Sequence, residues 1–217
     1  MQYLGIDLSG PSNSKDTVLV HFKKQRDKLY YEHHETSIND HALITYIESL
    51  ANTDSVTIGI DAPLSYEDGG GDRESDRDLR SFVTGLGMKG ASIMPPTMMR
   101  MVYLSLRGIR ITREIERLCT QYEIHLVEVH PGAALGARME TVDDVLHYKK
   151  ELSIRKRIRE WFETQQLIRI PKAMAEESHT IDACAAALAA WHWQDPDYEP
   201  AWLYKAALPL HPYDFCC

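Results

Sequence analysis

Acidic residues stand at the ends of three apolar segments. Asp7 and Asp61 each directly follow a Gly-Ile pair in an apolar run, and Glu128 lies near the end of a third run. A carboxylate that closes a buried strand is costly unless a metal ion or a cation compensates for its lost hydration. In open α/β sheets, ligands bind at the carboxyl ends of the strands. We therefore expect these three carboxylates to form one site if their strands are parallel neighbours.

A fourth acidic candidate is Asp182, in the pattern His179-x-x-Asp182. Residues three apart share one face of a helix, and the alanines that follow would let this helix lie close against a sheet. Oxygen-rich ligand sets suit magnesium or manganese, whereas zinc prefers cysteine and histidine. We expect Asp7, Asp61, Glu128 and Asp182 to hold Mg²⁺ or Mn²⁺. His179 would assist proton transfer or product release.

Each acidic residue also has an ordinary structural explanation. A single aspartate after a strand is commonly a turn residue or a helix cap. Glu128 alone could pair with an arginine, and Asp182 could interact with the dipole of its own helix. The shared site is favoured because three such residues each follow an apolar run.

The elements that must position these residues follow from the apolar periodicity. Five strands are predicted, at residues 3–6, 17–22, 28–32, 55–61 and 124–129. Helices are predicted at residues 40–50, from about 73, and at 98–122, 133–138, 142–166 and 178–193. Three successive strands followed by alternating strands and helices indicate a mixed α/β sheet with its antiparallel part first.

Length and composition limit the class of protein. A chain of 217 residues, 44% hydrophobic and 26% charged, is typical of one globular domain. We expect residues 1–217 to form a single domain with an irregular tail from about 194. The 24 basic and 32 acidic residues give a net charge of −8. This excludes a protein that is basic throughout but leaves room for a local basic groove.

Targeting and redox signals are absent from the sequence. The apolar run at 183–191 is shorter than the ~20 residues of a membrane helix, and the first residues do not resemble a signal peptide. The four cysteines include no C-x-x-C pair, so neither a zinc site nor a disulfide framework is predicted. We expect a cytoplasmic protein without membrane contact. The sequence does not determine the oligomeric state, and a dimer is one possibility.

Basic residues gather in the segment 149–172, with eight basic and three acidic side chains. A charge run of this kind is usually the solvated face of a helix. The functional alternative is a positive wall that faces the acidic centre, as a phosphodiester substrate would require. Under that alternative, Arg155, Lys156 and Arg159 bind substrate, and Arg73 and Arg77 contact phosphate.

Five segments carry a resemblance to a known family. They are residues 5–10, 60–65, 73–77 with Asp76, 128–132 and 179–183. From residue 1 to about 193, the chain resembles the domain-of-unknown-function family 429, predicted nucleases of the ribonuclease H fold. The resemblance implies a ribonuclease H-like mixed sheet of five strands in the order 3-2-1-4-5, flanked by helices and with a helical insertion. It also implies that the four carboxylates match the metal set of polynucleotidyl transferases and junction resolvases.

The predicted function is therefore that of a metal-dependent nuclease or phosphodiesterase, with nucleic acid or a nucleotide as substrate. Two alternatives remain open. One is a nucleotide-binding relative of actin-like ATPases, for which a dimer could supply the second domain that such proteins need. The other is a catalytically silent interaction module that kept the fold.

Overall fold

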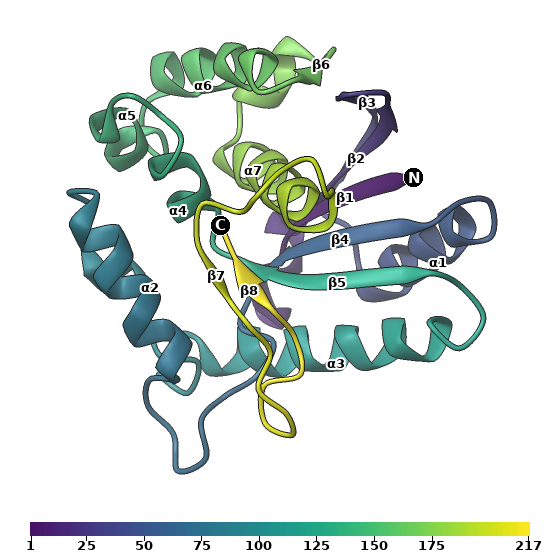
Figure 1. Ribbon diagram of the computed structural model, residues 1–217, viewed down its shortest axis with the longest axis vertical. Helices are drawn as coiled ribbons and strands as arrows, with labels where there is room; N and C mark the ends of the chain where they lie inside the picture. Colours follow the sequence, from purple (N-terminus) through teal and green to yellow (C-terminus); the bar gives the residue numbers. More distant parts are fainter.

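A mixed sheet runs through the centre of the protein (Figure 1). The structure is a computed structural model that describes residues 1–217. The sheet has eight strands in the order β6-β3-β2-β1-β4-β5-β8-β7. Their bounds are β1 (Gln2–Asp7), β2 (Val18–Gln25), β3 (Lys28–Thr36), β4 (Val56–Asp61), β5 (Ile124–Val129), β6 (Leu167–Ile168), β7 (Leu203–Tyr204) and β8 (Phe215–Cys216).

Strand direction and register place the acidic residues. The pairs β1–β2 and β2–β3 are antiparallel, whereas β4 runs parallel to both β1 and β5. Asp7 of β1 lies directly opposite Asp61 of β4. In the next pair, Ile60 of β4 lies opposite Glu128 of β5. Since side chains alternate between the two faces of a sheet, Asp7 and Asp61 share one face and Glu128 points to the other.

Helices surround the sheet, and none of them is long and apolar enough to cross a membrane. The helices are α1 (Asp40–Ala51), α2 (Glu74–Gly85), α3 (Val102–Leu118), α4 (Pro131–Gly136), α5 (Val142–His147), α6 (Leu152–Thr164) and α7 (Ser178–Gln194). There are also three short 3₁₀ helices, η1 (Pro11–Asp16), η2 (Gly90–Ser92) and η3 (Lys172–Ala175).

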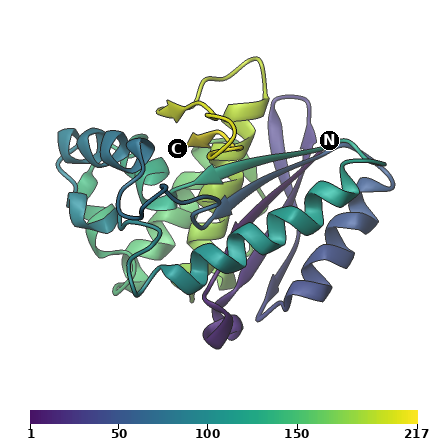
Figure 2. The same cartoon turned by 90° about the horizontal axis from the view of Figure 1, so that it is seen from below.

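The two faces of the sheet carry separate apolar cores. On one face, Leu4, Ile58 and Leu126 pack with residues of α1 and α3. On the other face, α7 lies across β1, β2 and β4, and α4 and α6 pack against it. Figure 2 shows α3 and α1 together on one side of the strands, with α7 on the far side.

Two glycines allow α7 to approach the sheet backbone. A Cβ at Gly5 of β1 would lie 1.8 Å from the carbonyl oxygen of Ala183, and a Cβ at Gly59 of β4 would lie 2.4 Å from that of Ala186. Neither position can therefore carry a side chain in this packing. The small side chains of α7, most of them alanines, complete the contact and are fully buried. Helix and sheet meet here backbone to backbone.

The expected count of five strands was wrong, because the sheet has eight. The three additional strands, β6, β7 and β8, are two residues long each and are too short to show an alternating pattern. Two of them lie in the tail after residue 194, which was expected to be irregular. The helix expected at 142–166 is divided into α5 and α6 by residues 148–151.

Replacing Gly5 by alanine tests the close approach of α7. We expect Gly5→Ala to lower the free energy of unfolding by at least about 3 kcal/mol, because the added methyl group meets backbone that cannot move aside cheaply. The matched control is Gly10→Ala, where the backbone φ is −63° and no atom lies within 4 Å of the new Cβ. The control should change the stability by less than about 0.5 kcal/mol in urea unfolding. Equal stability of the two variants would contradict this packing.

Candidate functional site

Two aspartates lie side by side at the carboxyl ends of β1 and β4. Asp7 and Asp61 are register partners on parallel strands, so their side chains leave the same face of the sheet next to each other. Asp7 is 8% exposed and Asp61 is partly buried. Both line one cavity, which we call the acidic cavity.

The first turn of α7 brings two more ligand-type side chains to Asp7. His179 Nδ1 lies 2.7 Å from Asp7 Oδ2. Asp182, one helical turn further along α7, is 1% exposed, and its carboxylate lies close to Asp7 and His179. One ligand atom each from Asp7, His179 and Asp182 lies within 4.8 Å of the other two. The structure thus joins these three residues in one group with the spacing of a metal site, and Asp61 stands beside it.

Asp182 is held by two side chains from the break between α5 and α6. The Tyr148 hydroxyl donates to Asp182 Oδ1, and Lys149 Nζ donates to Oδ2 at 2.8 Å. Tyr148 is buried, whereas the Lys149 side chain is 58% exposed. In the sequence, Lys149 stands out only as part of the basic segment 149–172, and Tyr148 carries no signal of a role. Their position in a short break between helices follows no periodic pattern that could have indicated a role.

The electrostatics of the group favour an additional positive charge. Desolvation raises the pKa of Asp7 to about 6, against the lowering effect of its hydrogen bond with His179. Desolvation, followed by the charges of Asp7 and Asp182, raises the pKa of Asp61 well above its usual value. The hydrogen bond with Asp7 raises the pKa of His179. A cation bound among these groups would relieve the cost of ionising them.

Glu128 belongs to a different interaction, which corrects its expected place among the metal ligands. Arg73 donates from Nη2 to Glu128 Oε1 at 2.5 Å and from Nη1 to Oε2 at 2.8 Å. The backbone N–H of Leu64 donates to Oε2 at 2.9 Å. Both carboxylate oxygens are therefore engaged by other groups, although Glu128 lines the same cavity as Asp7. The physical reason is the register, in which Glu128 is aligned with Ile60 and not with Asp61.

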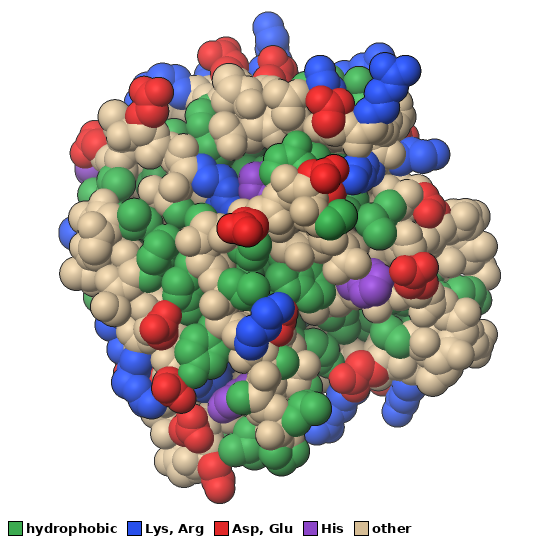
Figure 3. Space-filling model, viewed as in Figure 1, with side chains coloured by type: hydrophobic (Ala, Val, Ile, Leu, Met, Phe, Trp, Pro, Cys, Tyr) green, Lys and Arg blue, Asp and Glu red, His purple; other side chains and the backbone are tan.

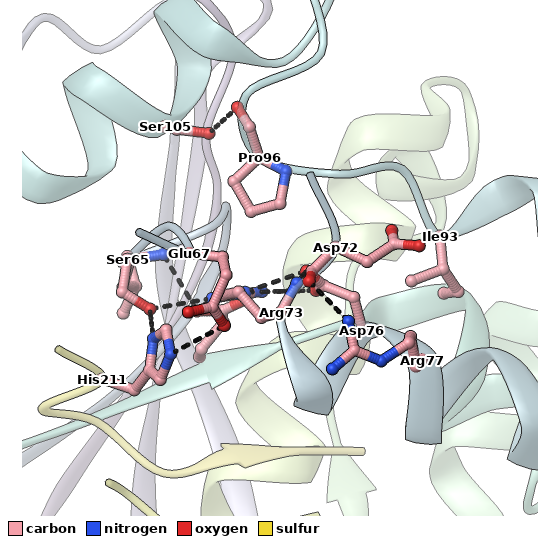
Figure 4. A network of polar contacts seen from close by, with 12 residues as sticks. Ser65, Glu67, Asp72, Arg73, Asp76, Arg77, Ile93, Pro96, Ser105 and His211 are labelled. Carbon is pink, nitrogen blue, oxygen red and sulfur yellow. Dashed lines mark hydrogen bonds and ion pairs between the residues drawn. The ribbon is translucent and has the colours of Figure 1, made fainter. Parts of the chain in front are cut away.

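Arg73 is equally unavailable for the phosphate contact that was expected of it. Its side chain is 4% exposed and donates to both Glu128 and Asp76. Arg73 also donates to the Ser65 hydroxyl at 3.1 Å, and Ser65 Oγ lies 2.9 Å from His211 Nδ1 (Figure 4). The Ser65 hydroxyl accepts from the guanidinium, which can only donate, and its contact with the imidazole links Arg73 to His211. The network ties the segment before β8 to the loop after β4.

The other four predicted substrate contacts do not form a basic wall. Arg155 donates to the carbonyl oxygens of Ala175, Tyr148 and Glu176, and Arg159 donates to that of Ile170. These two side chains thus hold backbone in place and are not free for substrate. Arg77, which donates to the carbonyl oxygen of Asp72, and Lys156 are both exposed. In Figure 3 the basic side chains over α6 and β6 lie among acidic ones.

The acidic cavity has a volume of about 600 Å³ and a mixed lining. Its charged residues include Asp7, Asp61, Asp182 and Lys149, and also the group of Arg73, Asp76 and Glu128. Half of the 26 lining residues are hydrophobic, among them Met88, Ile93, Met94 and Met101 from the segment between α2 and α3 and Leu104 of α3. The size is within the range of small-molecule sites. The cavity can therefore receive a compact ligand with both polar and apolar groups.

Breaking the Arg73–Glu128 pair should destabilise the protein without affecting a metal. We expect Glu128→Gln to lower the free energy of unfolding by about 1–3 kcal/mol in the presence of a chelator, because the buried Arg73 loses one of its two charged partners and keeps only Asp76. The control is Glu123→Gln, whose side chain is 69% exposed and contacts only His125 as an ion pair. Unfolding in urea measures both variants. A stable Glu128→Gln variant that loses metal binding would restore Glu128 to the metal ligands.

Neutralising Asp61 should have the opposite effect. The pKa of Asp61 is higher in the folded protein than in the unfolded chain, so its ionisation destabilises the fold increasingly as the pH rises toward the folded pKa. We expect Asp61→Asn to melt above the wild type at pH 8 in chelator, and the gain to shrink toward pH 4. In a chain of this size, each 1 kcal/mol corresponds to about 2–4 °C. A lower melting temperature at pH 8 would show that Asp61 has a structural role.

Comparison with known proteins gives a family. No curated protein matches the chain. A family model described as "Protein of unknown function (DUF429)" matches residues 5–201, which include all the residues of the group around Asp7. Because the match extends over most of the sequence, the chain belongs to the DUF429 family.

Proposed function

We propose that this protein is a divalent-metal-dependent hydrolase of phosphodiester bonds, with a nucleic acid or nucleotide as substrate. The observation that carries the proposal is the convergence of Asp7, His179 and Asp182 within 4.8 Å, at the end of the sheet where a cavity opens. Two-metal and one-metal phosphoesterases place carboxylates in this way around the ions that they use.

The donor set fits a divalent ion. Two carboxylates suit Mg²⁺ or Mn²⁺, and an imidazole adds a nitrogen ligand that first-row transition metals accept, so Mn²⁺ satisfies both kinds of donor. Asp7, His179 and Asp182 would hold the ion. When bound, it would supply Lewis-acid polarisation of a phosphoryl oxygen and a water of lowered pKa.

The side chains around this group have separate tasks in such a reaction. Asp61 has no hydrogen-bonded partner in the protein, and burial raises its pKa well above the usual value, which makes the ionised carboxylate a stronger proton acceptor than that of an exposed aspartate. It lines the cavity next to Asp7, so a water bound there lies within its reach. The hydrophobic side chains of the cavity contact the apolar part of the ligand.

The arrangement of the longest strands also supports the proposal. Within the sheet, β3, β2, β1, β4 and β5 follow one another in that order, and α7 lies over β1 and β4. We propose that these elements are a ribonuclease H-like core, to which β6, β7 and β8 are added at the two sides. The acidic residues then occupy the first strand, the fourth strand and the last helix of that core.

Mn²⁺ titration by calorimetry tests this function. We expect the wild type to bind Mn²⁺, and Asp7→Asn and Asp182→Asn to bind it at least tenfold more weakly, because each removes one charged ligand. Affinity should rise between pH 6 and pH 8, since Asp7 and His179 must lose their protons to bind a metal. Asp143→Asn, whose side chain is 81% exposed, is the control.

Turnover is measured with bis(p-nitrophenyl) phosphate and with oligonucleotides. The two aspartate variants should lose the Mn²⁺-dependent activity and keep their folded circular dichroism spectra. Binding of ATP without any hydrolysis of phosphodiesters would favour a nucleotide-binding relative of the actin-like ATPases. Binding of neither metal nor nucleotide would favour a silent interaction module.

A further inference from the structure

Lys149 holds the place on Asp182 that a metal ion would need. Its ammonium donates to Asp182 Oδ2, and the Tyr148 hydroxyl engages Oδ1, so both carboxylate oxygens already have a partner. A metal–carboxylate bond of about 2.0–2.2 Å leaves no room for the ammonium on the same side of the oxygen. Each carboxylate oxygen has a second lone pair, but the charges of Asp61 and Asp7 also act on the Lys149 ammonium, which therefore lies on the side of Asp182 that faces them. An ion bound between Asp182 and Asp7 takes this position and displaces the ammonium.

The two partners of Asp182 are not equally easy to displace. Tyr148 is 2% exposed and belongs to the larger apolar core. Lys149 extends from the break between α5 and α6 with 58% of its side chain exposed, and its flexible stem lets the strongly hydrated ammonium move into water while the ion replaces its charge on Asp182. The ammonium is therefore the group that leaves, and the tyrosine remains as an anchor.

The freed ammonium would stay next to the site, because Lys149 lines two cavities. One is the acidic cavity. The second, of about 350 Å³, has no hydrophobic lining and includes Lys15, Arg155 and His179 together with Glu176, Glu177 and Asp16. A displaced Lys149 thus remains between the metal group and open polar space. There it can contact an anion bound to the metal.

Other cations of the acidic cavity cannot fill this role. Arg73 is committed to Glu128 and Asp76. Lys89, from the segment between α2 and α3, lines the cavity but forms no ion pair with Asp7 or Asp182. A phosphate at the metal group therefore depends on Lys149 for a positive partner from the protein. The rest of the ligand would face Met94, Met101 and Ile93.

We propose that the natural ligand is a nucleotide-sized phosphoester, whose phosphate is bound jointly by the metal and by Lys149 after the metal has displaced Lys149 from Asp182. Its base or another flat apolar group occupies the methionine-lined part of the cavity. This inference rests on the proposed function and narrows it from polymeric nucleic acid to a small phosphoester. It makes metal binding and phosphate binding cooperative, since the first event releases the group that the second one uses.

The test uses Lys149→Gln, with Lys150→Gln as the matched control, because Lys150 is the exposed neighbour. Lys149→Gln should bind Mn²⁺ at least fivefold more tightly than the wild type, because the competing ammonium is gone. With Mn²⁺ present it should bind adenosine monophosphate at least tenfold more weakly. The wild type should bind adenosine monophosphate much more tightly with Mn²⁺ than without it. Lys149→Arg, which keeps the charge, covers the case in which the glutamine variant does not fold, and should remain cooperative.

The outcomes separate this inference from the proposed function. Mn²⁺ binding by the wild type with the same affinity in Lys149→Gln would overturn the displacement alone. Equal affinity of the wild type for adenosine monophosphate with and without Mn²⁺ would overturn the cooperativity, and tighter binding of a duplex oligonucleotide would overturn the ligand class. Absence of Mn²⁺ binding by the wild type would overturn both proposals together.

Discussion

The site depends on how closely α7 can approach β1 and β4. Gly5 and Gly59 leave the strand backbone bare, and the alanines of α7 keep the helix surface flat, so the two backbones come into direct contact. Any larger side chain at Gly5 would push the helix outward and move His179 and Asp182 away from Asp7. The ligand distances are thus set by packing at positions that carry no chemistry themselves.

The acidic cavity is lined by two kinds of buried charge. Around the start of α7, Asp7, Asp61 and Asp182 leave an excess of negative charge that Lys149 and His179 offset in part. In the second group, Glu128 and Asp76 share one arginine, which donates hydrogen bonds to both carboxylates. The first arrangement resembles a binding site, because Asp61 has no hydrogen-bonded partner, and the second resembles a structural ion pair. A difference of one residue in register decides which role a carboxylate takes.

Sequence reasoning could place Asp7, His179 and Asp182 together, because strand ends and helical spacing follow simple periods. It could not place Glu128, since β5 is apolar on both faces and its register with β4 leaves no mark in the residue types. Counting charges likewise could not show that Arg155 and Arg159 bind carbonyl oxygens. Those bonds depend on where the chain turns after α6, and the two-residue strands depend on the same long-range geometry.

The residues around Asp7 lie on segments that differ in how easily they unfold locally. Every residue from Thr180 to Trp191 is buried, so amide hydrogens there should exchange with solvent only when the whole domain unfolds. His179 and Asp182 are carried by this slowly exchanging unit, as is Asp7 on the adjoining strand. Lys149 extends from the four-residue break between α5 and α6, and 58% of its side chain is exposed. An ion could therefore enter and leave many times during the life of one folded molecule, without any loosening of the framework that holds it.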